Sequence, residues 1–250
     1  ISTISTSKNH TEISMSRTLT IAFDGKRAAN NKTGLGNYSR HIINLLAKFS
    51  PDNRYIVFLP KNGKNPQFQA ILGENRNIEV VTPTSRFWKK FSSLWRVFGI
   101  RNEISAFQDI IYHGLSNELP LTIKKTPAKS VVTIHDLIFL RFPQYYKFLD
   151  RMIYSYKFRK SCQNADQIIA VSECTKRDIV EFFGIEPDKI SVIYQGCDKV
   201  FKSESDSDTM QNVKRKYNLP DRFLLNVGSI EERKNALLIV KALPILTEKL

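Results

Sequence analysis

The chain is poor in cysteine and has no long apolar run. Its three cysteines show no CxxC spacing, so neither a disulfide framework nor a zinc site is predicted. No apolar stretch approaches the roughly 20 residues that cross a bilayer, and the polar first residues lack the apolar segment of a signal peptide. These absences predict a protein of a reducing, cytoplasmic compartment.

Several catalytic signatures are also missing. The sequence contains no GxSxG, no HExxH, no GxxxxGK[ST] and no carboxylate pair in a glycosidase setting. Gly34 and Gly36 match part of the dinucleotide fingerprint, but Ser39 stands where its third glycine would be. Hydrolysis, P-loop chemistry and a nicotinamide cofactor are therefore disfavoured, and no metal site is expected.

Acidic residues are outnumbered, with 24 Asp and Glu against 38 Lys and Arg, which gives a formal net charge of +14. Such a surface attracts polyanions, although no element that reads nucleic acid is apparent. Residues 86–101 carry five basic and no acidic side chains among aromatic residues at helical spacing, and residues 145–160 repeat the pattern. Each segment either packs inward or faces an anionic membrane. The membrane contacts expected from the first segment are Trp88, Lys89, Lys90, Trp95 and Arg96.

Apolar, strand-like segments alternate with helical patterns along most of the chain. This alternation predicts a mostly parallel sheet with helices on both faces, a doubly wound, Rossmann-like α/β fold. Because ligands of such sheets bind beyond the carboxyl ends of the strands, the residues that follow each strand matter most. The predicted strands are 19–23, 55–59, 78–81, 109–112, 129–134, 166–171 and 189–193, and the predicted helices include 37–49 and 173–183.

Composition divides the chain into four parts. Residues 1–17 form a polar leader that is expected to be disordered, and residues 18–195 form the first Rossmann-like domain. Residues 196–209 are polar and acidic, as in a linker, and residues 210–250 begin a second Rossmann-like domain. This last part is smaller than a domain that buries a sufficient core, so we expect either a fragment or a segment that leans on the first domain.

An apolar run at 223–227 ends at Gly228, and a helical pattern begins at Asn235. We interpret the run as a buried strand, so the unit is a strand, a short turn and a helix. A turn of this kind presents free backbone N–H groups and the positive end of a helix, to which Arg233 and Lys234 add two charges. The pattern favours a phosphate or diphosphate ligand, and a solvated basic helix start is the alternative.

Two histidines follow strands at the same predicted edge of the sheet. His135, with Asp136 beside it, follows strand 129–134, and His113 follows the strand before it. A single histidine there is more often structural, but two favour a functional role such as orienting a sugar hydroxyl or carrying a proton. Ser172 and Glu173 are expected to cap a helix instead.

Six segments occur in a recognisable order: TGLGNYSRHIINLL, YHGLSNELP, VVTIHDLIFLRFP, ADQIIAVSECTKRDIVEFFGI, ISVIYQG and LLNVGSIEERKN. Together they resemble the motif series of family 4 of the glycosyltransferases, which are retaining enzymes of the GT-B fold. The pattern is most similar to bacterial mannosyltransferase-like members that build surface polysaccharides. The resemblance runs from about Leu19 to the last residue.

The resemblance implies two Rossmann-like domains that face each other across a cleft. The first would receive a lipid-linked or saccharide acceptor at the inner face of the cell membrane. The second would hold a nucleotide-sugar such as GDP-mannose or a UDP-hexose, without a cofactor or metal, and the donor phosphate itself would accept the proton of the acceptor. The implied residues are Gly34, Gly36, Gly228, Arg233 and Lys234 for the donor phosphates, His135 and Asp136 for catalysis, and Asn37, Tyr38 and His113 on the acceptor side.

One departure from the family limits the expected activity. The pair of glutamates with which the family grips the donor belongs further along the second domain, beyond Leu250. We therefore expect an amino-terminal fragment that is inactive alone, while the full-length parent transfers a hexose. The competing function is a non-catalytic basic module that binds a membrane surface or another polyanion.

Overall fold

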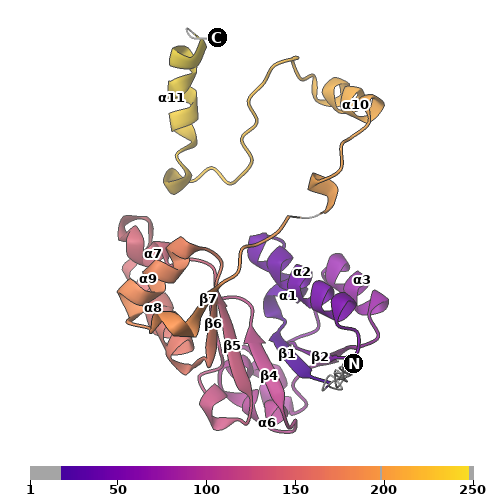
Figure 1. Cartoon of the computed structure of the whole chain (residues 1–250), viewed down its shortest axis with the longest axis vertical. Coiled ribbons are helices and arrows are strands. Elements are labelled where there is room, and N and C mark those ends of the chain that lie inside the picture. The colour runs from indigo at the N-terminus through magenta and orange to yellow at the C-terminus, as the bar shows by residue number, and fades with distance from the viewer. Residues whose placement is uncertain (1–17, 198, 248–250) are drawn as a thin grey trace, which may run out of the picture.

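The computed structural model describes residues 18–197 and 199–247 (Figure 1). The leader expected at residues 1–17 lies outside the described residues. Seven parallel strands form one sheet in the order β3-β2-β1-β4-β5-β6-β7, which confirms the doubly wound α/β fold. The strands are β1 (Thr20–Asp24), β2 (Arg54–Phe58), β3 (Ile78–Val81), β4 (Ile110–Gly114), β5 (Lys129–Ile134), β6 (Gln167–Ala170) and β7 (Ile190–Val192).

The seven strands predicted for the first domain are therefore present: β3 and β5 have the predicted bounds, and the ends of the other five differ from the predictions by one or two residues. Their buried side chains alternate between two apolar clusters, one on each face of the sheet, as the period of a strand requires. Ala22 and Ile56 belong to one cluster, whereas Phe23 and Val57 belong to the other. The two-sided burial explains why these strands are almost continuously apolar.

Helices cover both faces of the sheet, with α1 to α3 on one side and α7 to α9 on the other (Figure 1). The α-helices of this sheet domain are α1 (Lys26–Asn30), α2 (Gly34–Phe49), α3 (Pro66–Glu74), α4 (Arg86–Lys90), α5 (Ser92–Leu94), α6 (Arg101–Ile104), α7 (Ile138–Arg141), α8 (Phe148–Asn164) and α9 (Glu173–Phe183). The short helical turns of the domain are η1 (Trp95–Gly99), η2 (Ile123–Lys125), η3 (Pro143–Tyr145) and η4 (Pro187–Lys189).

Local sequence signals set both ends of α9, and the cap at Ser172 was predicted. The hydroxyl of Ser172 accepts a hydrogen bond from the backbone N–H of Thr175 at 3.1 Å, which caps the first turn. Gly184 ends the helix with φ = 65°, a left-handed conformation that glycine adopts without steric cost. These caps fix the segment that follows β6.

The basic aromatic segment 86–101 does not form the single helix that its periodicity predicted. It is divided into α4, α5, a π-helical turn (η1) and the start of α6. Phe91 separates α4 from α5 with φ −106° and ψ 48°, outside the helical region. The break allows both tryptophans to turn inward, and burial of large aromatic side chains outweighs the loss of regular helical hydrogen bonds.

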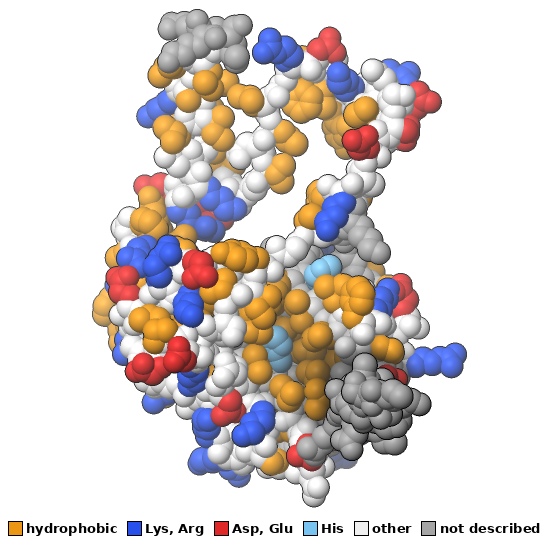
Figure 2. All heavy atoms as spheres, in the orientation of Figure 1, with side chains coloured by type: hydrophobic (Ala, Val, Ile, Leu, Met, Phe, Trp, Pro, Cys, Tyr) orange, Lys and Arg blue, Asp and Glu red, His pale blue; other side chains and the backbone are white. Residues whose placement is uncertain are grey.

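Residues 199–247 extend beyond the carboxyl edge of the sheet (Figure 1). They contain η5 (Lys199–Phe201), α10 (Ser207–Tyr217), η6 (Glu232–Lys234) and α11 (Ala236–Thr247), so α10 begins inside the predicted linker. The strand predicted at 223–227 is wrong for this structure: Phe223, Leu224, Leu225 and Val227 are exposed and belong to no strand. A single strand needs a neighbour for its N–H and C=O groups, and no described strand lies beside this segment. Figure 2 shows apolar side chains uncovered along this part of the chain.

Candidate functional site

Side chains from separate elements meet at the carboxyl edge of the sheet, around the end of β5. His135 follows β5 directly, and Tyr38 comes from the beginning of α2. The centroids of their rings lie 4.7 Å apart, with the ring planes at 89°. This edge-to-face contact holds two of the predicted site residues together, and their roles stay predictions.

His135 is fixed by hydrogen bonds on its backbone and on its ring. Its backbone N–H donates to the side-chain oxygen of Asn117 at 2.7 Å, and its ring Nε2 lies 2.9 Å from the carbonyl oxygen of Leu115. Burial lowers the pKa of His135, although the Leu115 carbonyl and the charge of Asp136 act in the opposite direction. The imidazole is therefore neutral at physiological pH, and its Nδ1 carries a lone pair that can accept a hydrogen bond.

His113 lies behind this site rather than in it. Its side chain is buried, and its Nε2 is 2.8 Å from the hydroxyl of Thr133, which in turn lies 3.2 Å from the hydroxyl of Tyr38. Burial, together with the neighbouring His135, lowers the pKa of His113 to about 4. His113, which the resemblance placed on the acceptor side, is thus connected to Tyr38 through the hydroxyl of Thr133.

The two glycines predicted in a loop, Gly34 and Gly36, lie in the first turn of α2 and have different roles. Gly36 is buried, and a Cβ at this position would lie 2.1 Å from the carbonyl oxygen of Asn31, so backbone packing alone requires glycine here. Its N–H already points to Thr33 and Asn31. Gly34 is exposed, and a Cβ there would meet nothing within 4 Å. Only Gly34 leaves room for a ligand at the start of the helix.

A hollow of about 370 Å³ adjoins the start of α2. Its lining includes Asn37, one of the predicted acceptor-side residues, together with Lys32 and Asn65. Asp136 is exposed, and its carboxylate accepts a hydrogen bond from the N–H of Ile138 at 3.3 Å, which fixes the start of α7. The side chain of Asp136 thus has a structural partner, and its catalytic role stays a prediction.

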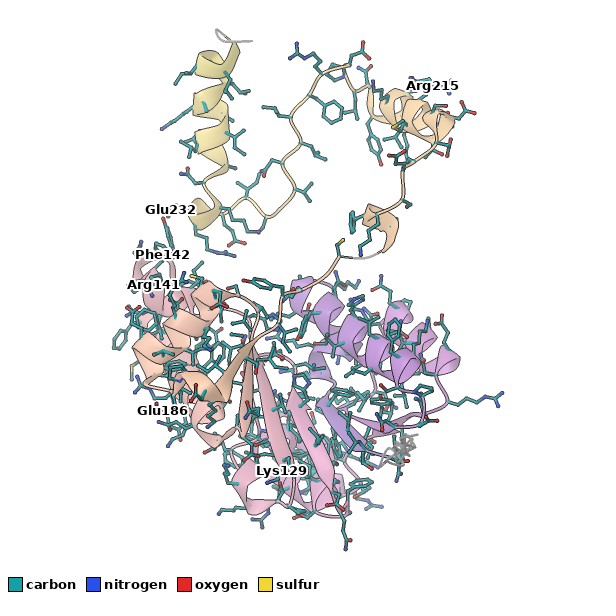
Figure 3. The ribbon with its side chains drawn as sticks, viewed as in Figure 1. Lys129, Arg141, Phe142, Glu186, Arg215 and Glu232 are labelled. Carbon is teal, nitrogen blue, oxygen red and sulfur yellow. The ribbon has the colours of Figure 1, made fainter. Side chains whose placement is uncertain are left out.

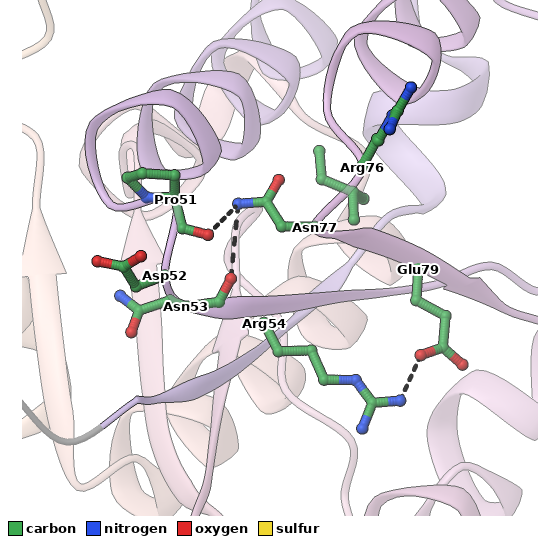
Figure 4. Close-up of a pocket in the computed structure, with 8 residues that line it drawn as sticks. Pro51, Asp52, Asn53, Arg54, Arg76, Asn77 and Glu79 are labelled. Atoms are coloured by element: carbon green, nitrogen blue, oxygen red, sulfur yellow. Dashed lines mark hydrogen bonds and ion pairs between the residues drawn. The ribbon is translucent and has the colours of Figure 1, made fainter.

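A second hollow, of about 240 Å³, lies at the opposite, amino edge of the sheet (Figure 4). It is formed where β2 and β3 begin, and the side-chain amide of Asn77 donates to the carbonyl oxygen of Pro51 at 3.1 Å there. Arg54 and Glu79 form an exposed ion pair across the same region. Because ligands of parallel α/β sheets bind at the carboxyl edge, this hollow is not part of the candidate site.

The basic turn at Gly228 forms as a local unit. The ammonium of Lys234 donates to the hydroxyl of Ser229 at 3.0 Å, and it lies 3.3 Å from the position that a Cβ on Gly228 would occupy. Arg233 pairs with Glu231 at 2.7 Å. The turn faces the sheet domain, since the charge of Arg233 acts on Tyr146, and Figure 3 shows Glu232 above Arg141 and Phe142 of that domain.

Two of the expected membrane contacts on the first basic segment are wrong. Trp95 is fully buried, and Arg96 forms an interior ion pair, because η1 turns both side chains into the domain. Trp88 packs over Gly99, where a Cβ would lie 2.6 Å from the indole. Lys89 and Lys90 are exposed, and their membrane role stays a prediction.

Sequence reasoning missed the residues that support the site. The side chain of Asn117 accepts the hydrogen bond from the backbone N–H of His135. The backbone of Asn117 has φ = 65°, a conformation that asparagine tolerates better than most residues. Arg96 lies 2.6 Å from Asp24 and 2.5 Å from Glu118, so it joins η1 to the end of β1 and to the segment that follows β4. The post-strand position of Asp24 was a signal, but its partner lies 72 residues away. Within the described residues, no group of three or more His, Cys, Asp or Glu side chains could hold a metal ion.

Comparisons with known proteins agree with this architecture. The chain is 27% identical over 157 residues to the serotype-specific mannosyltransferase WbdA of Escherichia coli, and this match covers 57% of the chain and 18% of WbdA. It is 28% identical over 142 residues to the O-antigen chain mannosyltransferase B of Escherichia coli, covering 56% of the chain and 36% of that protein. The chain thus spans well under half the length of these curated relatives.

Solved structures share the fold. The complex of Anabaena HepE with UDP and glucose superposes with a TM-score of 0.59 at 15% identity, over 90% of this chain and 57% of HepE. A glycosyltransferase from Rickettsia africae gives a TM-score of 0.58 at 18% identity, over 93% of this chain and 58% of its own. The sequence model of Glycosyltransferase Family 4 matches residues 33–200, more than half of the chain. The chain belongs to Glycosyltransferase Family 4.

Proposed function

We propose that the protein transfers a mannose-like hexose from a nucleotide-sugar, such as GDP-mannose or a UDP-hexose, to a lipid-linked or saccharide acceptor. The observation that carries this proposal is the neutral, firmly held His135 beside Tyr38 at the carboxyl edge of the sheet. The mannosyltransferase relatives from Escherichia coli support the choice of hexose. The UDP and glucose of the HepE complex support a nucleotide-sugar as donor.

The residues of the site divide the chemical work between them. The neutral imidazole of His135 can accept a hydrogen bond from a sugar hydroxyl and so orient the hexose. Lys234, whose ammonium lies close to Gly228, and Arg233 of the same turn can stabilise the negative charge that develops on a leaving nucleoside diphosphate. In this proposal the configuration of the sugar is retained, and the donor phosphate accepts the proton of the acceptor. No metal is required for these steps.

A transfer assay tests the proposal. The protein expressed from its complete gene is incubated with radiolabelled nucleotide-sugars and with lipid-linked or saccharide acceptors. We expect transfer of label from at least one donor, and we expect His135→Ala to lower it about 100-fold or more, because the site loses an oriented polar group. His41→Ala on α2 is the matched control and keeps the wild-type rate. Equal rates for the two variants would remove His135 from the site.

The chain alone is expected to show negligible turnover in the same assay. The reason is structural: the segment before Gly228 forms no strand, and its apolar side chains are exposed, so the turn that would hold the diphosphate has no rigid support. Preorganised donors are what make such a site effective. Robust turnover by the chain alone would contradict this part of the proposal.

The exposed surface of the sheet domain favours an anionic membrane as a further partner. Large apolar side chains point outward from α8, and others point outward from the segment of α4 to η1. Both segments pack their inner sides on the same apolar cluster, and Glu118 contacts Arg96 of η1 and Lys157 of α8. We call these outward side chains the outer apolar surface: Phe87, Phe91, Leu94, Phe98, Phe148, Leu149, Met152, Ile153 and Tyr156.

Charge accompanies the outer apolar surface. Lys89 and Lys90 are exposed on α4, and Lys147, just before α8, and Lys160, in the last two turns of α8, are exposed as well. Asp150 is the one acidic residue of α8. Apolar side chains beside basic ones bind the surface of an anionic bilayer, and each basic residue near the lipid contributes about 1 kcal/mol. None of the helices in residues 18–197 and 199–247 has the length and apolar composition to span a bilayer. The contact that we propose is a peripheral one, at the inner face of the cell membrane.

Vesicle sedimentation tests whether the outer apolar surface, rather than other exposed apolar residues, binds lipid. We expect the chain to sediment with phosphatidylglycerol vesicles and to lose this binding when Phe148, Leu149 and Met152 are changed to Ser. The control variant changes Leu224, Leu225 and Val227, which are equally exposed, to Ser and keeps binding. Lys89→Glu with Lys90→Glu should weaken binding more than Lys216→Glu with Lys241→Glu. Equal binding by the two Ser variants, or self-association of the chain through α8 without lipid, would reject the membrane surface.

A further inference from the structure

Gln195 lies on the chain segment that leaves the sheet domain. The last ladder hydrogen bond joins the N–H of Ile193 to the carbonyl oxygen of Ala170 at 3.0 Å, two residues before Gln195. From this point the chain rises away from β7 toward α10 (Figure 1). The side-chain amide of Gln195 nevertheless turns back into the domain, where its Nε2 lies 3.2 Å from Nδ1 of His135.

The hydrogen bonds of His135 define which ring nitrogen is basic. Its Nε2 faces the carbonyl oxygen of Leu115 at 2.9 Å, and a carbonyl can only accept, so Nε2 carries the proton. In a neutral imidazole the other nitrogen, Nδ1, then has the lone pair. The amide N–H of Gln195 donates to that lone pair. Gln195 therefore covers the atom of His135 through which this residue can accept a hydrogen bond or a proton.

The other contacts of His135 come from the domain itself. Asn117 accepts from its N–H, the hydroxyl of Thr175 in α9 donates to its carbonyl oxygen at 3.1 Å, and the Tyr38 ring lies against its ring. These partners keep the ring in place when the segment beyond β7 moves. Gln195 is the contact that such a movement would break, because it lies outside the sheet and is exposed.

We propose that Gln195 is a positioning residue that caps Nδ1 of His135 and thereby couples the position of the linker to the state of this histidine. With the cap in place, His135 is held neutral with its proton on Nε2. When the linker moves, Nδ1 is uncovered, and a hydroxyl of the bound substrate takes the place of the Gln195 amide. The cap itself is independent of the proposed function, whereas its replacement by a substrate hydroxyl rests on it.

The groups around His135 determine at which pH this residue takes up a proton. Three uncharged groups face His135: the buried, neutral imidazole of His113 on β4, the phenol of Tyr38 on α2 and the hydroxyl of Thr175 on α9. Asp136, next in the chain, favours the protonated form of His135. Gln195 favours the neutral form, because its N–H can bond Nδ1 only while this atom has its lone pair.

Nuclear magnetic resonance of the imidazole nitrogens tests the cap directly. Long-range ¹H–¹⁵N spectra of the uniformly labelled chain report which nitrogen of each of its four histidines carries the proton at each pH. His135→Gln assigns the signals of His135. We expect the Nε2–H tautomer in the wild-type chain, with a Nδ1 resonance that is displaced by a donated hydrogen bond.

Two substitutions of Gln195 must change this signature in a defined order. Gln195→Ala removes the donor, so Nδ1 loses the displacement and the titration midpoint of His135 rises. Gln195→Glu replaces the donor by a carboxylate, so the midpoint rises further, by about one pH unit or more above wild type. Gln211→Glu, the same charge change at an exposed position of α10, leaves the spectrum unchanged.

The outcomes separate the cap from the enzymatic function. If Gln195→Ala and Gln195→Glu both leave the Nδ1 resonance and the titration midpoint of His135 as in the wild type, Gln195 does not cap this histidine. The backbone amide spectrum shows whether each variant is folded, and if one of them does not fold, the other alone decides. The Nε2–H tautomer in the wild type and raised midpoints in the Gln195 variants would support the cap even if the full-length protein transferred no sugar. That combination would overturn only the proposed function.

Discussion

The edge of one aromatic ring rests on another where β5 ends: the rings of Tyr38 and His135 meet at 89° with their centroids 4.7 Å apart. The same tyrosine reaches the hydroxyl of Thr133 at 3.2 Å, so α2, β5 and the candidate site are held by one side chain. The contact links the glycine-loop helix to the histidine that our functional account places next to the transferred sugar.

Removing the hydroxyl of Tyr38 and removing its whole ring should have different effects. Tyr38→Phe loses the hydroxyl bond to Thr133, which we expect to cost about 1 kcal/mol in the free energy of unfolding, while the ring still supports His135. Tyr38→Ala removes the ring as well and should lower the transfer rate about tenfold or more, because a misplaced site residue is costly. Urea unfolding and initial transfer rates measure the two effects. If Tyr38→Phe reduces the rate as much as Tyr38→Ala, the hydroxyl rather than the ring is the functional group.

The interior ion pair of Arg96 should dominate the stability of the segment from α4 to α6. Asp24 raises the pKa of Arg96 further; the side chain of Asp24 is buried and that of Arg96 is mostly buried. Arg96→Met leaves the buried carboxylate of Asp24 without its ion-pair partner and leaves Glu118 with Lys157 alone, so we expect a loss of about 3–5 kcal/mol in the free energy of unfolding.

Lys90→Met is the control for that experiment, because Lys90 is exposed in the same basic segment. This substitution should change the free energy of unfolding by less than about 0.5 kcal/mol. Similar losses for the two variants, measured by urea unfolding at neutral pH, would show that the Arg96 network does not stabilise the domain as described.

Stability should fall as the pH falls from about 6.5 to about 4, owing to His113. Burial lowers the pKa of this residue from 6.5 to about 4, so in this window the unfolded chain binds a proton that the folded protein excludes. The contribution of His113 to the free energy of unfolding is therefore fully present above pH 6.5 and decreases as the pH falls to about 4, by about 3 kcal/mol across this window. The pKa of His135 is also lowered, which adds to the effect in the same direction.

Urea unfolding of the wild type and of His113→Asn at a series of pH values isolates this contribution. Carboxylates titrate in both proteins, so the difference between the two curves reports on His113. We expect the difference to shrink as the pH is lowered through the window, since the variant has no imidazole to protonate. A difference that is independent of pH would mean that His113 is protonated as readily in the folded protein as in the unfolded chain.

Lys234→Ala should reduce hexose transfer while leaving the sheet domain folded. Its ammonium lies beside Gly228 and contacts only the hydroxyl of Ser229 among the described hydrogen bonds, so it is available for a diphosphate. Loss of one charge-assisted contact to a leaving group is expected to lower kcat about 100-fold. Lys241→Ala on α11 should keep the wild-type kcat, and equal kcat values for both variants would end the assignment of Lys234.

Much of the fold could be predicted because its signals are local. Apolar strands bounded by polar residues, and caps such as Ser172 and Gly184, act within a few residues, so β3, β5 and α9 have the bounds that the sequence predicted. His135 and Tyr38 could be placed at one edge because the carboxyl ends of parallel strands lie on the same side of a sheet.

The remaining features depend on contacts between distant residues. Periodicity predicted one amphipathic helix at 86–101, but burial of Trp95 and pairing of Arg96 with Asp24 turn this segment inward. The apolar run at 223–227 has the composition of a strand, yet a strand forms only beside another. Gln195 lies in the segment ISVIYQG at the end of the first predicted domain, but its contact with His135 could not be predicted, because the two residues are 60 positions apart and only the fold brings them together.

A crystal structure of the protein with a bound nucleotide-sugar tests the central claim most directly. The account predicts that the diphosphate lies at the turn from Gly228 to Lys234, and that a hydroxyl of the substrate lies about 3 Å from Nδ1 of His135, where the Gln195 amide stands in the free chain. A nucleotide-sugar bound elsewhere, with both the Gly228 turn and the His135 edge empty, would contradict it.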